Sequence, residues 1–149
     1  MYKRSWNKKY GKSEIFTLED SYCQNVEIDM VRLAEGMTKS YDEENKEFGL
    51  LILGGKCTVE GDGFKYENIG ERETVFDGNA TCVYVPRNTK FTITACGEVS
   101  LAVTKCPSKN DHKPVLIKPE DVVAKDMGKP GWERHAMFIL DERVEADQI

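Results

Sequence analysis

The chain has 149 residues, the length of one domain, which argues against a multi-domain enzyme with its own cofactor domain. Hydrophobic residues make up 40% and charged residues 32%, a balance typical of a folded globular domain and not of a disordered chain. A net charge of −5, with no basic block longer than Lys8-Lys9, excludes a surface built for nucleic acid or anionic lipid.

Residues 1–24 are treated as an N-terminal segment. The first ten residues are charged, and no apolar stretch of signal-peptide length follows them. The longest uncharged apolar run, 48–53, is far shorter than the roughly 20 residues that a membrane-spanning helix needs. We therefore expect no secretory signal and no membrane span, and we expect the chain to be cytoplasmic.

Residues 25–106 predict a β-barrel. Turn signals recur at short, even intervals, as in Gly54-Gly55 and Asp77-Gly78-Asn79. In Phe91-Thr-Ile-Thr-Ala95 apolar and hydroxyl residues alternate with the period of two that a half-buried strand requires. The expected strands, rich in β-branched and aromatic residues, are 26–33, 48–53, 56–60, 64–68, 81–85, 90–95 and 99–104. This spacing is typical of an all-β antiparallel jelly-roll barrel with little helix.

Residues 107–149 are predicted to form a C-terminal extension that packs on the barrel. A polar, proline-bounded linker is followed by a short strand at 115–117 and a short helical turn that begins at Pro119. The last strand is expected at 136–140. The closing residues, 141–147, have little to pack, so we interpret them as a connection that leads to a missing second barrel.

Metal-ligating and nucleophilic residue types are sparse. The chain has two histidines, His112 and His135, so three imidazoles cannot surround a metal within it. Its five cysteines form no CxxC pair, and the sequence therefore predicts neither a zinc ribbon nor a thioredoxin-type redox site. We expect the cysteines to be small, reduced core residues.

Two stretches resemble a degenerate cupin barrel. The first cupin motif keeps its frame over residues 36–54, with a glutamate at Glu47, but Ser40-Tyr41-Asp42 stand where the motif has histidines. The second motif, Pro-x-Gly-x-x-His, corresponds to residues 86–91 and ends in Phe91, which cannot bind a metal. The resemblance implies a cupin-like double-stranded β-helix that lacks the metal-ligating histidines.

A second resemblance covers most of the chain. Its segments are Val31-Arg-Leu-Ala-Glu-Gly36, Leu53-Gly-Gly-Lys-Cys-Thr-Val59, Gly70-Glu-Arg-Glu-Thr-Val-Phe-Asp-Gly78, Val83-Tyr-Val-Pro86, Phe91-Thr-Ile-Thr-Ala95, Ile117-Lys-Pro-Glu-Asp-Val122, and Arg134 before Phe138-Ile-Leu140. In order and approximate spacing they resemble the N-terminal half of the 5-deoxy-glucuronate isomerase family of myo-inositol catabolism. The resemblance implies a two-barrel enzyme of carbohydrate metabolism. It also implies a divalent metal in the absent second barrel, with no metal or cofactor in this chain.

The reaction that this resemblance implies is an aldose–ketose isomerisation of 5-deoxy-glucuronate, a proton shift between C1 and C2 of the sugar. Such a shift needs a base and an electrophile, commonly a divalent metal. The candidate catalytic residues are Glu47, as a base or a lone ligand oxygen, and His135. For Glu47 we favour the alternative of a solvated charge at the start of a strand, because residues 42–47 are rich in charge.

Arg134 and Tyr84 are the candidate substrate-binding residues. The planar guanidinium of Arg134 could bind a substrate carboxylate through two hydrogen bonds, and a surface ion pair is the alternative. Tyr84 would contact a ligand if it faced the barrel lumen, and we favour a packing role. His112 is expected in an exposed loop, and the pair Arg72–Asp77 is expected to stabilise a turn.

Three hypotheses for the function stay open. The chain could be the metal-free N-terminal domain of a sugar-acid isomerase, a non-catalytic cupin-like module that binds carbohydrate or dimerises, or a small metal-independent enzyme that uses Glu47 or His135. We expect a sugar-acid ligand and a homodimer, and we expect no nucleic-acid or membrane partner.

Overall fold

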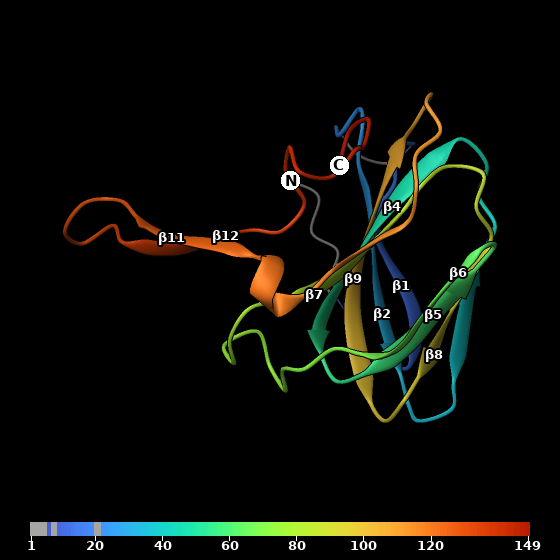
Figure 1. The fold of residues 1–149 in the computed structure, drawn as a ribbon, viewed down its shortest axis with the longest axis horizontal. Helices are drawn as coiled ribbons and strands as arrows, with labels where there is room; N and C mark the ends of the chain where they lie inside the picture. The colour runs from blue at the N-terminus through green and yellow to red at the C-terminus, as the bar shows by residue number, and fades with distance from the viewer. Residues whose placement is uncertain (1–5, 7–8, 20–21) are drawn as a thin grey trace.

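The computed structural model describes residues 6, 9–19 and 22–149, and the other positions of the N-terminal segment lie outside these residues. The described chain consists of antiparallel strands and one short 3-10 turn, which confirms the all-β prediction (Figure 1). The elements are β1 (Gly11–Phe16), β2 (Glu27–Leu33), β3 (Thr38–Tyr41), β4 (Lys46–Gly54), β5 (Cys57–Gly61), β6 (Phe64–Ile69), β7 (Thr81–Val85), β8 (Phe91–Ala95), β9 (Val99–Pro107), β10 (Val115–Ile117), the 3-10 turn η1 (Pro119–Asp121), β11 (Val123–Met127) and β12 (Arg134–Phe138).

Two sheets face each other and form the barrel. One sheet has six strands in the order β1-β2-β9-β4-β7-β10, and the other has four in the order β3-β8-β5-β6. Side chains of β2, β8 and β9 alternate between buried and half-buried positions, as strands with one face in the core require. The alternation predicted for residues 91–95 is therefore confirmed.

Apolar side chains fill the interior of the barrel. Its core is a continuous cluster of buried residues from both sheets, which includes Val31, Leu50 and Ile93. At one end of the cluster the rings of Tyr41, Phe48 and Phe91 lie together. The ring centroids are 5.3 Å apart for Tyr41 and Phe91, and 5.0 Å apart for Phe48 and Phe91. Such offset and edge contacts are favourable, so aromatic rings occupy the lumen.

The outer face of the six-stranded sheet is also covered. A second cluster forms there, and its members come from the sheet and from residues beyond β10: Cys82, Tyr84, Ile117 and Val122, with Leu51, Val115, Met137, Ile139, Leu140, Val144 and Ala146 packed against them. Added bulk at Gly49 of β4 would meet the side chains of Leu140 and Ile149. The C-terminal residues thus lie directly on the sheet.

Strands β11 and β12 form a two-stranded ribbon, which we call the arm (Figure 1). It projects away from the two sheets, and its base joins the barrel at η1. The last strand was expected at 136–140, but β12 lies two residues earlier, at Arg134–Phe138. Strand β11 was not predicted, because all five of its residues are exposed and Lys125 interrupts the apolar residues of its one partly apolar face.

The cysteines only partly fit the prediction of a core role. Cys57, Cys82 and Cys106 are buried, whereas Cys23 is intermediate and Cys96 is exposed. Burial raises the pKa of the Cys57 and Cys82 thiols to about 12, so these thiols stay protonated at neutral pH. The expectation is wrong for Cys96, which directly follows β8 at the turn into β9.

The loop between β6 and β7 is held by Arg72, though not in the predicted way. The buried Arg72 guanidinium donates to the backbone carbonyls of Ile52 and Gly78. Asp77 instead accepts from the backbone N–H and the hydroxyl of Thr74, at 2.9 and 2.7 Å. The predicted Arg72–Asp77 pair is therefore replaced by two separate sets of bonds that stabilise the same loop.

Gly55 is expected to be one of the least replaceable positions. Its φ is +88°, and an added β-carbon would overlap the carbonyl oxygen of Glu98. Gly63 also has a positive φ, +81°, but an added β-carbon there has open space. We expect Gly63→Ala to lower the free energy of unfolding by about 1 kcal/mol through backbone strain alone, and Gly55→Ala to lower it by about 3 kcal/mol. Urea unfolding of both variants measures the difference, and equal losses would contradict the overlap at Gly55.

Candidate functional site

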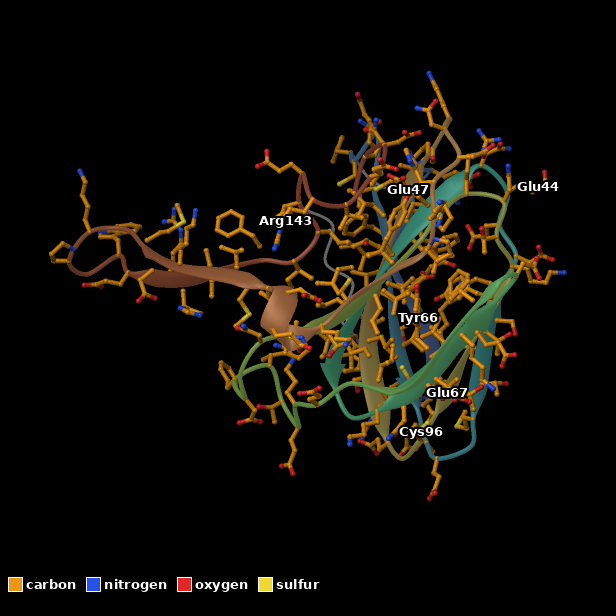
Figure 2. All side chains as sticks on the ribbon, in the orientation of Figure 1. Glu44, Glu47, Tyr66, Glu67, Cys96 and Arg143 are labelled. Atoms are coloured by element: carbon orange, nitrogen blue, oxygen red, sulfur yellow. The ribbon has the colours of Figure 1, made fainter. Side chains whose placement is uncertain are left out.

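Glu47 lies at the start of β4 with its side chain on the outer face of the six-stranded sheet (Figure 2). Phe48, the next residue, points into the barrel core. Because neighbouring side chains of a strand point to opposite faces, the carboxylate of Glu47 faces away from the lumen. The side chain is 0% exposed, so the expectation of a solvated charge is wrong.

Hydrogen bonds from four donors compensate the burial of the Glu47 carboxylate. The Tyr84 hydroxyl donates to Oε2 at 2.9 Å, and the backbone N–H of Asp147 donates to the same oxygen at 3.0 Å. The backbone N–H groups of Gln148 and Ile149 donate to Oε1 at 2.6 and 3.0 Å. A buried carboxylate is costly unless it accepts such bonds. Glu47 therefore anchors the backbone of the last residues to the sheet.

Tyr84, on β7, lies on the same outer face as Glu47. Its neighbours Val83 and Val85 belong to the barrel core, whereas Tyr84 is 0% exposed beneath the C-terminal residues. It does not face the barrel lumen, where it would contact a ligand, and it packs in the cluster on the outer face of the sheet instead. Burial, together with the hydrogen bond to Glu47 and the charge of that carboxylate, raises the pKa of Tyr84 well above its usual value. The hydroxyl is thus held protonated as a donor.

Asp147 extends this cluster to the linker that follows β9. Its carboxylate accepts hydrogen bonds from the Ser108 hydroxyl, from the backbone and side-chain N–H groups of Asn110 and from the backbone N–H of Lys109. Nε2 of His112 lies 3.0 Å from Oδ1. The hydrogen bonds from His112, Asn110 and Lys109 lower the pKa of Asp147 below its usual range.

His112 is therefore not the exposed loop residue that the sequence predicted. Its side chain is largely covered, and its ring centroid lies 6.5 Å from that of Tyr84. We call Glu47, Tyr84, His112 and Asp147 the C-terminal clamp. A groove of about 360 Å³ borders the clamp at Asp147 and Gln148. Sequence reasoning missed the clamp because His112 and Asp147 are 35 positions apart.

The two other candidate residues, Arg134 and His135, lie on the arm. His135 Nδ1 is 2.8 Å from Asp126 Oδ1 across the ribbon, and both side chains are exposed. Arg134 is exposed and lies opposite Met127. The structure therefore brings Glu47 and Tyr84 together, and it places Arg134 and His135 on a different element.

A charged cluster that the sequence did not predict lies inside one end of the barrel. Lys105 Nζ is 3.5 Å from a carboxylate oxygen of Glu27 and 3.4 Å from oxygens of Asp29 and Glu43. Lys46 pairs with Glu27 at 2.6 Å and with Glu43 at 2.9 Å. The Tyr41 hydroxyl donates to Asp29 at 3.3 Å. We call these residues the lumen charge cluster, and it lies beside the aromatic rings of the lumen.

The metal-ligating capacity of the chain is low throughout the part that the structure describes. Within residues 6, 9–19 and 22–149, no three His, Cys, Asp or Glu side chains are grouped so that they could hold a metal ion. The carboxylates of the lumen charge cluster face lysine ammonium groups instead. In the same residues no helix has the length and apolar character needed to cross a bilayer.

Loops at the end of the barrel surround an open polar pocket of about 540 Å³. Its charged lining residues are Asp42, Glu43, Glu44, Asp62, Arg87 and Lys90. Lys90 pairs with Asp42 at 2.7 Å, and Arg87 donates to the Lys109 carbonyl and to the Asn45 side chain. The lining thus carries four carboxylates and two cations, and Lys90 and Asp42 form an ion pair within it.

Comparison with known proteins identifies the relatives of this chain. The sequence matches the model of the KduI/IolB family over residues 3–149. A 5-deoxy-glucuronate isomerase of Halalkalibacterium halodurans is 35% identical over 127 residues, which are 85% of this chain and 47% of that protein. The Bacillus licheniformis protein of the same name is 37% identical over 118 residues, 78% of this chain and 44% of that protein. The chain thus spans about half the length of these relatives.

Solved structures share the fold. An IolB-like protein of Salmonella typhimurium superposes with a TM-score of 0.89 at 24% identity, covering 95% of this chain and 54% of that one. The cupin domain of Schizosaccharomyces pombe Cnp3 superposes with a TM-score of 0.50 at 19% identity, covering 65% and 64%. The resemblance to the isomerase family and the cupin-like fold are both confirmed.

Proposed function

The chain belongs to the KduI/IolB family, and we propose that it forms the metal-free half of a 5-deoxy-glucuronate isomerase. The observation that carries the proposal is its similarity to curated isomerases over about half of their length. We also propose that this enzyme acts in inositol catabolism and that it is cytoplasmic. In this role the chain supports the reacting half and shapes the sugar site.

The divalent metal that the family resemblance implies does not fit the lumen of this chain. The rings of Tyr41, Phe48 and Phe91 fill that position, and none of the three supplies a metal ligand of the usual kind. We therefore assign these residues no step through a metal. The electrophile that an aldose–ketose isomerisation needs would belong to the other half of the enzyme.

The polar residues of this chain fit a supporting role. The Glu47 carboxylate accepts bonds from four donors, and the Tyr84 hydroxyl is bound to it. A general base needs a free lone pair within reach of the substrate proton. We propose that Glu47 and Tyr84 hold the C-terminal residues in place and that neither removes the C2 proton.

The isolated chain is expected to show no isomerase activity on 5-deoxy-glucuronate. Elemental analysis of the purified chain is expected to show no stoichiometric transition metal. A chimera, in which this chain replaces the matched stretch of the Halalkalibacterium halodurans isomerase, is expected to be active. Turnover by the isolated chain that disappears in Glu47→Gln or in His135→Gln, while the variant stays folded, would support the metal-independent alternative.

Arg134 is the residue that we propose for contact with the substrate carboxylate. It is exposed on the arm, and a guanidinium can donate two parallel hydrogen bonds to a carboxylate. In the chimera we expect Arg134→Gln to raise KM for 5-deoxy-glucuronate about tenfold or more with a smaller change in kcat. Lys129→Gln, in the turn of the arm, is the control. Equal KM values for Arg134→Gln and the unmodified chimera would remove this role.

A non-catalytic role is the second candidate, and the polar pocket at the barrel end favours it. The carboxylate of a sugar acid could bind the cations Arg87 and Lys90 of this pocket, and at Lys90 it would displace Asp42. The chimera discriminates the two roles. An inactive but folded chimera, together with saturable binding of glucuronate to the isolated chain, would favour a carbohydrate-binding module.

A further inference from the structure

The arm is a ribbon of two strands with few contacts to the rest of the protein. Its strands pair from Val123–Phe138 to Met127–Arg134, and all five residues of β11 are exposed. In Figure 1 it extends well beyond the two sheets. An isolated two-stranded ribbon is at best marginally stable in water. A surface that packs against the arm would therefore add substantially to its stability.

The two faces of the arm differ. Directly opposed residues of antiparallel strands share a face, so one face carries Ala124, Asp126, His135 and Met137. That face is attached to the protein at its base, where Met137 packs in the second core cluster. The other face, which we call the outer arm face, carries Val123, Lys125, Met127, Arg134, Ala136 and Phe138.

The outer arm face is apolar apart from two cations. Val123, Met127 and Phe138 are 37%, 40% and 38% exposed. The ammonium of Lys125 lies 5.6 Å from the centre of the Phe138 ring. With Arg134, it gives this face a positive charge on a chain whose net charge is −5. A partner surface that fits it is apolar with carboxylates at its edge.

At the base of the arm this face continues into a groove of about 430 Å³. The groove is lined by Val123, Lys125 and Phe138 from the arm and by Asp141, Glu142 and Arg143 from the segment that follows it. Arg143, labelled in Figure 2, links the arm to the segment that follows it through hydrogen bonds. It donates to the carbonyl of Asp121 at 2.7 Å, to that of Phe138 at 3.3 Å and to the Asp141 carboxylate at 2.7 Å. The groove is thus held in shape before anything binds.

The lengths of the relatives indicate what covers this face. The family match runs through the whole arm, and the 5% of the chain that the Salmonella structure leaves uncovered is too short to contain residues 123–138. The arm therefore belongs to the shared fold, whereas about half of each curated relative has no counterpart here. We propose that the outer arm face and its groove dock on that remaining half of the isomerase. The identity of the partner rests on the proposed function.

Hydrogen–deuterium exchange on the chimera with the Halalkalibacterium halodurans isomerase tests the docking. Covalent linkage gives the two halves a high effective concentration, so a modest mismatch between species does not prevent contact. We expect backbone amides of β11 and β12 to exchange at least tenfold more slowly in the chimera than in the isolated 149-residue chain. Val123→Asp with Phe138→Asp is expected to restore fast exchange. Ala124→Asp, one position away on the opposite face, is the matched control and is expected to keep the protection.

Each other outcome has a distinct meaning. Protection of β4 and β9 in every variant shows that the barrel is folded, so arm amides that exchange equally fast in both proteins overturn the docking. A concentration-dependent dimer of the isolated chain that protects the arm, and that Val123→Asp with Phe138→Asp abolishes, assigns the face to a second copy and also overturns it. Isomerase activity of the chimera is measured separately from amide exchange. An active chimera whose arm is not protected would contradict only the docking proposal. An inactive chimera whose arm is protected would contradict only the proposed isomerase function.

Discussion

Glu47→Gln is expected to lower the free energy of unfolding by about 3 kcal/mol and to release the last residues from the sheet. Glutamine keeps the shape of the side chain, but it places an NH₂ donor where the carboxylate accepts from Tyr84 and from three backbone N–H groups. Donors that face each other in a buried site lose their hydrogen bonds and repel. Urea unfolding measures the loss, and faster amide exchange at residues 147–149 locates it.

The control for this substitution is Glu44→Gln. Glu44 is an exposed glutamate three residues earlier, on the loop before β4 (Figure 2). We expect its replacement to change the unfolding free energy by less than about 0.5 kcal/mol. Unchanged stability of Glu47→Gln, with loss of turnover in the chimera, would contradict the anchoring role and make Glu47 a catalytic residue.

Lys105→Met is the second substitution with a large expected effect, again a loss of about 3 kcal/mol. The Lys105 side chain is buried, and its ammonium lies within 3.5 Å of carboxylate oxygens of Glu27, Asp29 and Glu43. Removing one partner of a buried ion pair leaves uncompensated charge in a medium of low polarity. Lys65→Met, which removes an exposed lysine that pairs with exposed glutamates on β5 and β6, is expected to cost less than about 0.5 kcal/mol.

The pH dependence of this loss identifies its cause. Burial alone would raise the pKa values of Glu27 and Glu43, but hydrogen bonds from Lys46 and the charges of Lys46 and Lys105 lower both below 4.5. A lowered pKa stabilises the folded chain above the pKa of the unfolded chain, and this contribution is lost as the pH falls through the folded value. The deficit of Lys105→Met should therefore shrink between about pH 7 and about pH 3. A deficit that is independent of pH would indicate lost packing instead.

Most barrel strands could be predicted from the sequence, because alternation with a period of two survives where one face meets the core. Strands β1 and β3, which have few buried residues, were not among the expected strands. The same alternation was harder to assign at the start of β2. Glu27 and Asp29 point inward, in phase with Val31 and Leu33, whereas Ile28 and Met30 are only half-buried. Local pattern alone favours the reverse. The inward charges are compensated by Lys105 from β9 and Lys46 from β4, and this pairing is a property of the fold.

The role of Glu47 could not be predicted for a similar reason. The cupin motif places a glutamate at this position, but a shift of one residue along a strand moves a side chain to the other face of the sheet. Phe48 occupies the lumen, and Glu47 points outward. Its partners at residues 147–149 are backbone groups about a hundred positions away, so no side-chain pattern signals the contact. Arg134 was a candidate because of the family resemblance and His135 because it is one of two histidines, but their place on an exposed ribbon required the structure.

Glu47 binds the main chain of the C-terminal residues, so the hydrogen bonds that hold this backbone do not depend on the side chains of those residues. Because Glu47 accepts from the N–H groups of Gln148 and Ile149, almost any side chain at these positions preserves both bonds. Proline is the exception, since it has no N–H to donate. The side chain of Gln148 is exposed, so the path of the backbone at this residue is set by a main-chain hydrogen bond to Glu47 and not by the chemistry of its side chain.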